Sequence, residues 1–446
     1  MPSTYLSNTS VTPTNAKKYT FSFWVKRSKI LVGAAAQRVI NVYTDSNNKL
    51  QVAFGTDDRL SIFDKESGAT RFSVTPSMMF RDPNGWYHIV IAADTTQSTS
   101  SDRMKIYVNG ELQTALESSP TYAGQDTNTG AQLTGSGARR IGANESAANH
   151  FDGLLSHFHF IDGTQYAASD FGSTDSTTGE WKINTSPSVT YGNNGYFILK
   201  DGNSVTDQSG NSNNWTVAAG TLTNTEDCPS NVFATINRLN PNAGENISFS
   251  AGNTSIDSAG GAHRNAPATI YLPLGNGKFY WEMKVDRMST HIKVGLVYDE
   301  WSKLNKPTPG EEFSGSNEGY AYRNDGQKEN NGLTSYGNSY TVGDIIGIAF
   351  DTENSNLYFA KNGTWQNSGD PTSGSTGTGK AFTVASGYVY APIVNLYDAD
   401  VSFNFGNGFF GTTAISSEGT NASGIGKFEY DVPAGYTALS TKGLNE

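Results

Sequence analysis

The sequence predicts an all-β protein that consists of two antiparallel β-sandwiches joined by a partly ordered connector. Glycine is abundant, with 48 residues, and aromatic residues make up 12% of the chain, a composition typical of short strands joined by turns. Long runs of Ala, Leu, Glu and Lys with helical spacing are absent from the sequence. A chain of 446 residues is also longer than one sandwich core requires, so more than one domain is expected.

The first sandwich is predicted from a series of strand-like motifs in the N-terminal part. The stretch TFSFWVKR at Thr20–Arg27 alternates apolar and polar residues, as expected for a strand with one buried face. WYHIVIAAD at Trp86–Asp94 and MKIYVNGEL at Met104–Leu112 follow, and FDGLLSHFHFIDG begins at Phe151. In this order the motifs resemble the strands of laminin-G-like, concanavalin-A-like jelly rolls. The resemblance implies a sandwich of two antiparallel sheets over residues 1–170.

A connector with short strands is expected over residues 171–245. The stretch DGNSVTDQSGNSNNW at Asp201–Trp215 consists almost entirely of turn-forming residues. Aromatic residues such as Trp181 and Tyr196 lie among these polar stretches, and such side chains normally pack against a surface. We therefore expect a partly ordered connector rather than a disordered linker. The last segment, residues 414–446, is expected to be a tail that packs on a neighbour.

The second sandwich is predicted most clearly by the hairpin VGDIIGIAFDTENSNLYFAKNG at Val342–Gly363. Ile345–Phe350 is apolar on both faces, a polar turn follows, and Leu357–Ala360 returns as a second strand. Together with the motifs GKFYWEMKV before it and VSFNFG after it, the hairpin resembles the core of SPRY domains, which are binding modules. The resemblance implies a SPRY-like sandwich over residues 246–413.

The whole arrangement resembles structural proteins of tailed bacteriophages, particularly marine ones. The resemblance covers the laminin-G-like domain, the connector motif SGNSNNW, the SPRY-like domain and the ending PAGYTALSTKGL. It implies a non-enzymatic protein of the virion surface, made in the host cytoplasm without a signal peptide. Such a protein would decorate the capsid or form a compact tail or head appendage, and would aid attachment to host-surface glycans. Its partners would be other virion proteins, a host glycan or protein, and further copies of the same chain.

Three alternatives remain at this point. They are a tail fibre that binds the host receptor, a stand-alone carbohydrate-binding lectin and, more remotely, a polysaccharide depolymerase. The sequence has neither coiled-coil heptads nor a repeated shaft, which favours a compact appendage over a long fibre.

Composition limits the other partners. The net charge is −11 and the basic residues do not cluster, which argues against nucleic-acid binding. No uninterrupted apolar run approaches the roughly 18 residues of a membrane span, so membrane insertion is not expected. Cys228 is the single cysteine, so the chain has no internal disulfide.

No catalytic residue is predicted. Glu282 and Asp286 have a spacing that could place two carboxylates on one strand face, as a glycosidase needs, but solvated strand ends are the more ordinary interpretation. His157 and His159, with His150 nearby, could share a face as metal ligands do, although exposed or edge histidines are more common. No G-x-S-x-G motif or phosphate-binding loop is present. We therefore expect a protein that is not an enzyme and requires no cofactor.

Aromatic side chains on loops of the second sandwich are the predicted ligand-binding residues, because exposed rings stack on sugars or anchor protein contacts. They are Trp301, Tyr320, Tyr322, Tyr336, Trp365 and Tyr397. The alternative interpretation is that several of them pack over the ends of their own sandwich.

A structural calcium ion is also considered, because laminin-G-like domains often hold one. Calcium takes about six to eight oxygen ligands. The candidate ligands are Asp94, Asp102 and Asp152, near predicted strand ends. The connector stretch from Asp207 to Asn211 is a weaker candidate, since it lacks the glycine of an EF-type loop.

Overall fold

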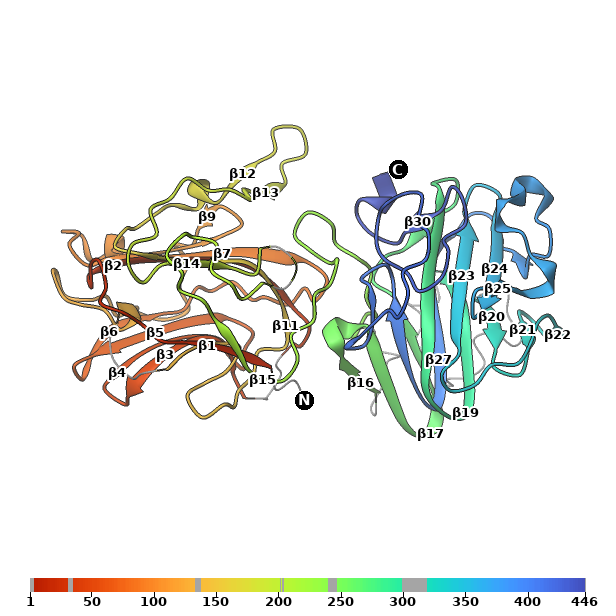
Figure 1. Ribbon diagram of the computed structural model, residues 1–446, viewed down its shortest axis with the longest axis horizontal. Helices are drawn as coiled ribbons and strands as arrows, with labels where there is room; N and C mark the ends of the chain where they lie inside the picture. The colour runs from red at the N-terminus through yellow and green to blue at the C-terminus, as the bar shows by residue number, and fades with distance from the viewer. Residues whose placement is uncertain are drawn as a thin grey trace. The chain divides into compact units, whose positions relative to one another are not determined.

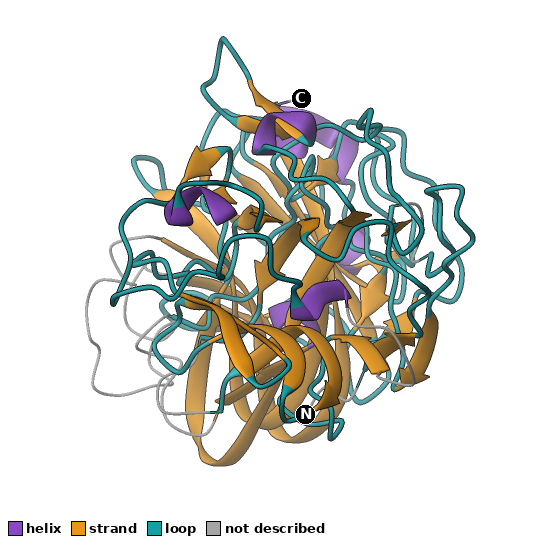
Figure 2. Ribbon diagram, turned by 90° about the vertical axis from the view of Figure 1, so that its left-hand side faces the viewer, coloured by secondary structure: helices purple, strands orange, loops and turns teal. Residues whose placement is uncertain are grey.

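The computed structural model describes residues 4–30, 35–132, 138–200, 202, 204–239, 247–298 and 319–445. Within these residues the chain is made of strands and loops, and its helical segments are short 3-10 turns (Figure 2). Among the described helices, none has the length and apolar character that a membrane span requires. The predicted all-β class is confirmed.

The chain divides into two compact units. We call Met1–Asn224 with Cys228–Ser230 the first unit, and Thr225–Asp227 with Asn231–Glu446 the second unit. The expected connector is therefore not a separate part, because most of it packs with the first unit. The C-terminal segment 414–446 packs within the second unit. The four expected parts thus become two units in the structure.

The first unit is a sandwich of two antiparallel sheets (Figure 1). In order, the seven-stranded sheet contains β15 (Thr216–Ala219), β1 (Tyr5–Asn8), β10 (Ala138–Ile141), β3 (Gln37–Asp45), β4 (Asn48–Phe54), β5 (Leu60–Glu66) and β6 (Ala69–Val74). The six-stranded sheet contains β14 (Tyr196–Ile198), β11 (Gly153–Asp162), β2 (Lys18–Arg27), β7 (Trp86–Asp94), β8 (Met104–Val108) and β9 (Glu111–Leu112). A short pair, β12 (Gly172–Thr174) and β13 (Trp181–Ile183), completes the unit.

The six-stranded sheet is buried on both faces. Along β2, Phe21, Phe23 and Val25 point into the core between the sheets. Ser22 and Trp24 point to the other face, and they too are almost fully buried. Figure 1 shows β12 and β13 on that outer side of the sheet, away from β3, β4 and β5. Residues of the expected connector therefore cover a sheet face that would otherwise expose large apolar side chains.

The second unit contains one network of 13 strands among its described residues. Its main path runs through β16 (Ile247–Ser250), β17 (Ser255–Pro267), β27 (Val389–Asn404), β19 (Lys278–Tyr298), β20 (Gly319–Arg323), β21 (Gln327–Glu329) and β22 (Leu333–Ser335). The branches are β18 (Leu272–Pro273), β23 (Ile345–Asp351), β24 (Asn356–Lys361), β25 (Thr364–Trp365), β26 (Phe382–Thr383) and β30 (Thr437–Ala438). A separate pair is formed by β28 (Phe409–Phe410) and β29 (Thr413–Ala414).

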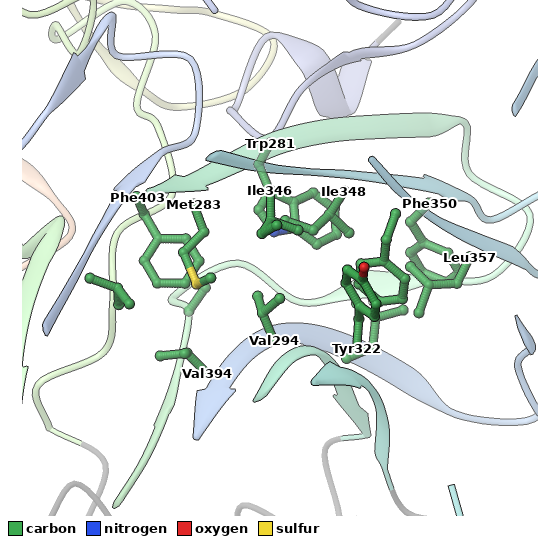
Figure 3. Packing of buried hydrophobic residues seen from close by; sticks show 14 of the residues in the cluster. Trp281, Met283, Val294, Tyr322, Ile346, Ile348, Phe350, Leu357, Val394 and Phe403 are labelled. Carbon is green, nitrogen blue, oxygen red and sulfur yellow. The ribbon is translucent and has the colours of Figure 1, made fainter. Parts of the chain in front are cut away.

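The long strands β19 and β27 take part in both layers of this sandwich. The register between them shifts between Val285 and Arg287 and again between Met288 and His291. Before these shifts β19 pairs with β23, and after them it pairs with β20. Because such irregularities bend and twist a strand, the two halves of β19 can belong to opposite layers. Figure 3 shows side chains of both halves meeting in one core, with Met283 facing Val294.

The predicted hairpin is confirmed as β23 and β24. Ile346, Ile348 and Phe350 point into the core (Figure 3), and the opposite face of β23 is buried too. Gly347 lies on that opposite face, where a Cβ atom would come within 2.7 Å of the Tyr280 hydroxyl. The close approach of a tyrosine from β19 therefore requires glycine at this position.

The C-terminal segment covers the outer face of β19, β23 and β24. Phe428, Val432 and Tyr436 pack with Tyr280 and Tyr358 in a second apolar cluster. In the same segment, β30 adds a short parallel strand beside β19. The segment expected to pack on a neighbour therefore packs against strands of its own unit.

Glu282 is the polar centre of this covered face and is fully buried. Its Oε1 accepts hydrogen bonds from the Tyr280 hydroxyl at 3.1 Å and from the backbone N–H of Tyr430 at 2.9 Å. Its Oε2 accepts from Asn404 Nδ2 at 3.1 Å and from the backbone N–H of Glu429 at 3.0 Å. Burial raises the pKa of Glu282 to about 7, although these four donors favour the ionised form. One carboxylate thus joins two central strands to the C-terminal segment.

Replacing Glu282 by Gln is expected to destabilise the protein by about 2–4 kcal/mol at pH 8, where the wild-type carboxyl is ionised. The amide nitrogen of Gln would face two N–H donors instead of accepting from them. Urea unfolding followed by tryptophan fluorescence measures the change. Glu353→Gln is the control, because the Glu353 side chain is 54% exposed and only pairs with Lys278 at 3.6 Å. Equal stability of E282Q and wild type would contradict the assigned role.

Candidate binding surfaces

Three of the six aromatic residues predicted to bind a ligand lie inside the second sandwich. Tyr320 and Tyr322 belong to β20 and are 4% and 0% exposed, and Tyr336 is 9% exposed. All three are members of the main core cluster. Their prediction as exposed residues is wrong. Alternate residues of β20 point into the core rather than toward solvent, and Tyr336, in the loop after β22, packs into the same core.

The other three predicted aromatic residues have different surroundings. Trp365 is partly buried and packs against Tyr280 and Tyr358 beneath the C-terminal segment. Trp301 lies outside the described residues. Tyr397 is partly exposed on β27, where its ring lies 5.0 Å from His263 and 6.4 Å from His291, measured between ring centroids. The structure therefore does not gather the six residues into one site.

The two carboxylates considered for catalysis, Glu282 and Asp286, have different surroundings. Glu282 is not at a solvated strand end, as the more ordinary interpretation expected, but is buried with both oxygens hydrogen-bonded. Asp286 is exposed and accepts a hydrogen bond from the Ser402 hydroxyl at 2.5 Å. Because one carboxylate is enclosed and the other faces solvent, the two do not form a pair in one cleft.

His159 and His157 do not follow a simple strand alternation. A register shift falls between Ser156 and His159, and His157 has a φ of 45°, so it occupies a bulge. The His159 ring is buried, stacks on Phe197 at 3.9 Å between centroids, and its Nδ1 lies 2.9 Å from the Tyr191 hydroxyl. The described residues include no cluster of three or more His, Cys, Asp or Glu side chains that could hold a metal ion.

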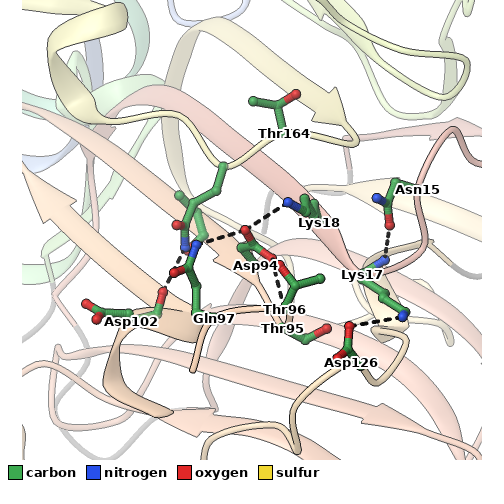
Figure 4. A network of polar contacts seen from close by, with 12 residues as sticks. Asn15, Lys17, Lys18, Asp94, Thr95, Thr96, Gln97, Asp102, Asp126 and Thr164 are labelled. Atoms are coloured by element: carbon green, nitrogen blue, oxygen red, sulfur yellow. Dashed lines mark hydrogen bonds and ion pairs between the residues drawn. The ribbon is translucent and has the colours of Figure 1, made fainter. Parts of the chain in front are cut away.

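The three candidate calcium ligands lie at different places on the first sandwich. Asp94 accepts hydrogen bonds from Thr96 and Gln97, and Lys18 Nζ lies 3.0 Å from its carboxylate (Figure 4). Asp102 lies near Asp94 in the same view and pairs with Lys105 at 3.5 Å. Here a lysine ammonium group supplies the positive charge that a metal would bring.

Asp152 is distant from the other two aspartates. Asp94 lies beside the first residue of β2, whereas Asp152 precedes Gly153, which pairs with the last residue of β2. Ten residues of strand separate these two ends by about 30 Å. In the connector, Asp207 accepts from the backbone N–H groups of Phe197, Ser209 and Asn213, as a structural turn does. Neither set of residues fits a calcium site.

The outer face of the six-stranded sheet is closed by an aromatic and histidine cluster that the sequence alone did not indicate. Burial lowers the pKa of His88, on β7, to about 3. Trp181 Nε1 donates to His88 Nδ1 at 3.0 Å, so the proton of the neutral ring lies on Nε2, which is 2.9 Å from the Ser22 hydroxyl. A Cβ at Gly110 would come within 2.5 Å of the Trp181 ring, so the glycine of the turn between β8 and β9 admits this tryptophan.

The outer face of the seven-stranded sheet remains open. Tyr43 on β3, Lys49 and Gln51 on β4, and Phe63 and Lys65 on β5 are partly exposed on one face. We call these five residues the open patch. They form two adjacent cross-strand rows, because Gln51 pairs with Phe63, and Lys49 pairs with both Tyr43 and Lys65. The opposite sides of the same strands form the core, and the patch borders Asn41, which pairs with Gln51 and is fully buried.

The open patch combines aromatic, amide and cationic groups. Lys49 Nζ lies 5.6 Å from the centroid of the Phe63 ring. Gln51 Nε2 donates to Asn41 Oδ1 at 3.3 Å and lies 3.5 Å from Glu145 Oε2. A flat aromatic ring beside fixed amides is the chemistry that sugar-binding surfaces use. The alternating pattern of β3 to β5 could have indicated this face, had the register between the strands been known.

Lowering the pH is expected to destabilise the first unit through His88. Its pKa in the folded protein is about 3, below the usual 6.5, so the stabilising contribution of the neutral ring is present above pH 6.5 and is lost as the pH falls toward 3. We expect the stability advantage of wild type over His88→Gln to shrink by about 3 kcal/mol between pH 7 and pH 4. Urea unfolding at each pH measures this difference.

His150→Gln is the matched control, because the His150 ring is partly exposed beside Tyr5. A difference between wild type and H88Q that stays constant with pH would contradict the neutral, buried state assigned to His88.

Comparisons with known proteins agree with the two sandwiches. A family model described as the concanavalin A-like lectin/glucanases superfamily matches residues 3–169, and a SPRY domain model matches residues 278–408. Similar solved structures include the SPRY domain of human HERC1, with 18% identity and a TM-score of 0.29 over 38% of this chain and 96% of that one. No curated protein matches the chain.

Two further solved structures resemble this chain to a similar extent. The SAP-like pentraxin of Limulus polyphemus has 14% identity and a TM-score of 0.27, over 36% of this chain and 71% of that one. Domain 4 of AbnA, an extracellular arabinanase of Geobacillus stearothermophilus solved with arabinotriose, has 17% identity and a TM-score of 0.25, over 34% and 63% of the two chains. The fold and the two family matches together establish a protein with a concanavalin A-like, laminin G-type domain followed by a SPRY domain.

Proposed function

We propose that this protein binds carbohydrate, without catalysis, through the open patch of the first unit. The main support is the match of residues 3–169 to the lectin/glucanase superfamily, whose description suggests carbohydrate binding. The choice of the open patch is supported by the different exposure of the two outer sheet faces. The outer face of the six-stranded sheet is filled by the chain's own residues, such as Trp181, whereas the five residues of the open patch are accessible.

The open patch supplies the groups that a glycan surface needs. The rings of Tyr43 and Phe63 offer apolar faces for the C–H groups of a sugar, as aromatic side chains do at binding surfaces. Gln51 offers an amide to sugar hydroxyls, and Lys49 and Lys65 add positive charge in a protein whose net charge is −11. These cations suit a glycan that carries carboxylate or other acidic groups.

The acidic residues near the patch support binding rather than hydrolysis. A glycosidase needs two carboxylates that face one cleft, roughly 5–10 Å apart. Asp45, at the end of β3, is held by Asn47 and Asn48, and Glu66, at the end of β5, pairs with Arg71. Both carboxylates are engaged at strand ends. Glu145, whose Oε2 lies 3.5 Å from Gln51 Nε2, borders the patch, but with Asp45 and Glu66 engaged elsewhere it does not complete the pair that hydrolysis needs.

The finer proposal is that the protein works on the surface of a phage particle, as a capsid decoration or a compact appendage that aids host attachment. Its support is the resemblance of the whole chain to tailed-phage structural proteins. The open patch would then face outward toward host glycans, and the SPRY domain would be available for contacts with other virion proteins or with copies of the same chain.

Binding of glycans to the purified protein tests the first proposal. We expect hits on a glycan array, with acidic glycans preferred, and at least about a tenfold loss of affinity by calorimetry in each of Tyr43→Ala and Phe63→Ala. Tyr388→Ala is the matched control, because Tyr388 is an aromatic residue of the second unit that is 37% exposed. A folded protein without any array hit, or one whose affinity survives both patch substitutions, would contradict the assigned site.

Quantitative mass spectrometry of purified particles tests the finer proposal. The protein should be present in every particle, with a high copy number for a capsid decoration and a low one for a tail appendage. Antibodies that label the heads or the tails distinguish the two positions. Absence of the protein from mature particles would contradict the virion proposal without affecting the proposal of carbohydrate binding.

A further inference from the structure

A small cavity lies inside the first sandwich. It has a volume of about 10 Å³, which is room for one water-sized particle. Its lining comes from both sheets: Ile40 and Val42 on β3, Phe21 on β2, Phe160 on β11 and Tyr196 on β14. The remaining lining residues are Asn41, Ala131, Arg139, Arg140 and Trp215. The cavity is thus largely apolar but includes one residue whose charge is unusual in a core.

That residue is Arg139 on β10, which is 3% exposed. It pairs with Val42 in the sheet register, and its guanidinium carbon lies 5.3 Å from the centroid of the Phe160 ring, so the side chain points into the core. Its Nη1 donates a long hydrogen bond of 3.4 Å to the carbonyl of Asn194. Its Nη2 has no hydrogen-bond partner, although it is buried.

No described carboxylate lies within ion-pair distance of Arg139. Burial lowers the pKa of Arg139, and the interactions with Tyr196 and then Asp162 offset this only in part. The Asp162 oxygens already accept hydrogen bonds from the backbone N–H groups of Thr14, Asn15 and Asn194. A buried guanidinium without a close counter-ion is strongly unfavourable, so the core leaves one positive charge to be compensated.

Trp215 supplies a second unpartnered donor at the same cavity. Its side chain is 3% exposed, it packs edge-on against Tyr196 at 5.0 Å between centroids, and its Nε1 has no acceptor. An indole N–H can only donate, and so can a guanidinium. Two buried donors without acceptors therefore belong to residues that line one small space.

The chemistry of this space favours an anion over water. A water molecule would accept from the two donors but would also need acceptors for its own hydrogens, and among the described lining side chains Asn41 Oδ1 is already bonded to Gln51. The Tyr196 hydroxyl is the other side-chain acceptor of the lining. A monoatomic anion needs only donors and supplies the missing negative charge.

We propose that the first sandwich binds one halide ion, chloride under physiological conditions, in the cavity lined by Arg139 and Trp215. The ion accepts from Arg139 Nη2 and Trp215 Nε1 and stabilises the folded unit by neutralising its buried cation. This interior site is independent of the open patch and of carbohydrate binding.

Thermal unfolding in different salts tests the site. Wild-type protein is dialysed into sodium gluconate and titrated with sodium chloride or bromide at constant ionic strength. We expect the melting temperature of the transition to rise saturably by at least about 2 °C with each halide. The response should be lost in Arg139→Met and weakened in Trp215→Phe. Arg59→Met is the matched control, since Arg59 belongs to the same unit, pairs with Asp57 at 2.8 Å, does not line the cavity and should keep the full response.

Crystals grown in bromide give a direct readout that does not depend on whether a variant folds. An anomalous peak between Arg139 and Trp215 in the wild-type protein is expected. Equal melting temperatures in gluconate, chloride and bromide would overturn the proposal, even with a peak, because binding would then occur at crystal concentration only. A halide response retained by R139M, or bromide peaks only elsewhere, would overturn it as well.

Discussion

In both units the fold depends on burying the outer, largely apolar face of one sheet layer. In each unit one layer carries large apolar side chains on both faces, so the sandwich core alone leaves side chains such as Trp24 or Tyr280 uncovered. Burial of such surface is the dominant favourable term in folding. The first unit covers its sheet with the segment around Trp181, and the second unit uses the segment around Phe428. Both covers contain only short strands, β12 and β13 in the first unit and β30 in the second, so side-chain hydrogen bonds add to the backbone pairing that holds them in place.

The hydrogen bonds that hold the two covering segments differ in charge: the acceptor is a neutral ring in the first unit and a carboxylate in the second. In the first unit a neutral imidazole, His88, accepts the hydrogen bond that positions Trp181. In the second unit the carboxylate of Glu282 gathers four donors, two of which are backbone N–H groups of the covering segment. His88 and Glu282 are both titratable and buried, so their burial and their hydrogen-bond partners determine their charge state. The sheet face around Tyr43 and Phe63 is instead partly exposed.

Much of the fold could be predicted from the sequence, because strand periodicity and turn chemistry are local. Both sandwiches, the Asn-Gly turn at Gly110 and the hairpin of β23 and β24 follow from patterns a few residues long. The surroundings of Glu282 could not be predicted from the sequence, because two of its hydrogen-bond partners lie about 150 positions later in the chain. Tyr320 and Tyr322 were misplaced because an alternating strand does not indicate which face is buried until its neighbours are known. For the same reason the open patch became visible only with the register of β3 to β5.

The second unit is closed by residues from its two ends. Ala234 donates to the carbonyl of Leu439 at 2.9 Å, Thr441 donates to that of Val232 at 2.9 Å, and the Thr441 hydroxyl accepts from Val232 at 3.0 Å. During synthesis, therefore, this sandwich cannot finish folding until residue 441 has left the ribosome, even though its central hairpin emerges much earlier. The face around Tyr280 stays uncovered during that interval. The second unit thus passes through a nascent state with exposed aromatic surface, in which chaperones or early association with another copy would have their greatest effect.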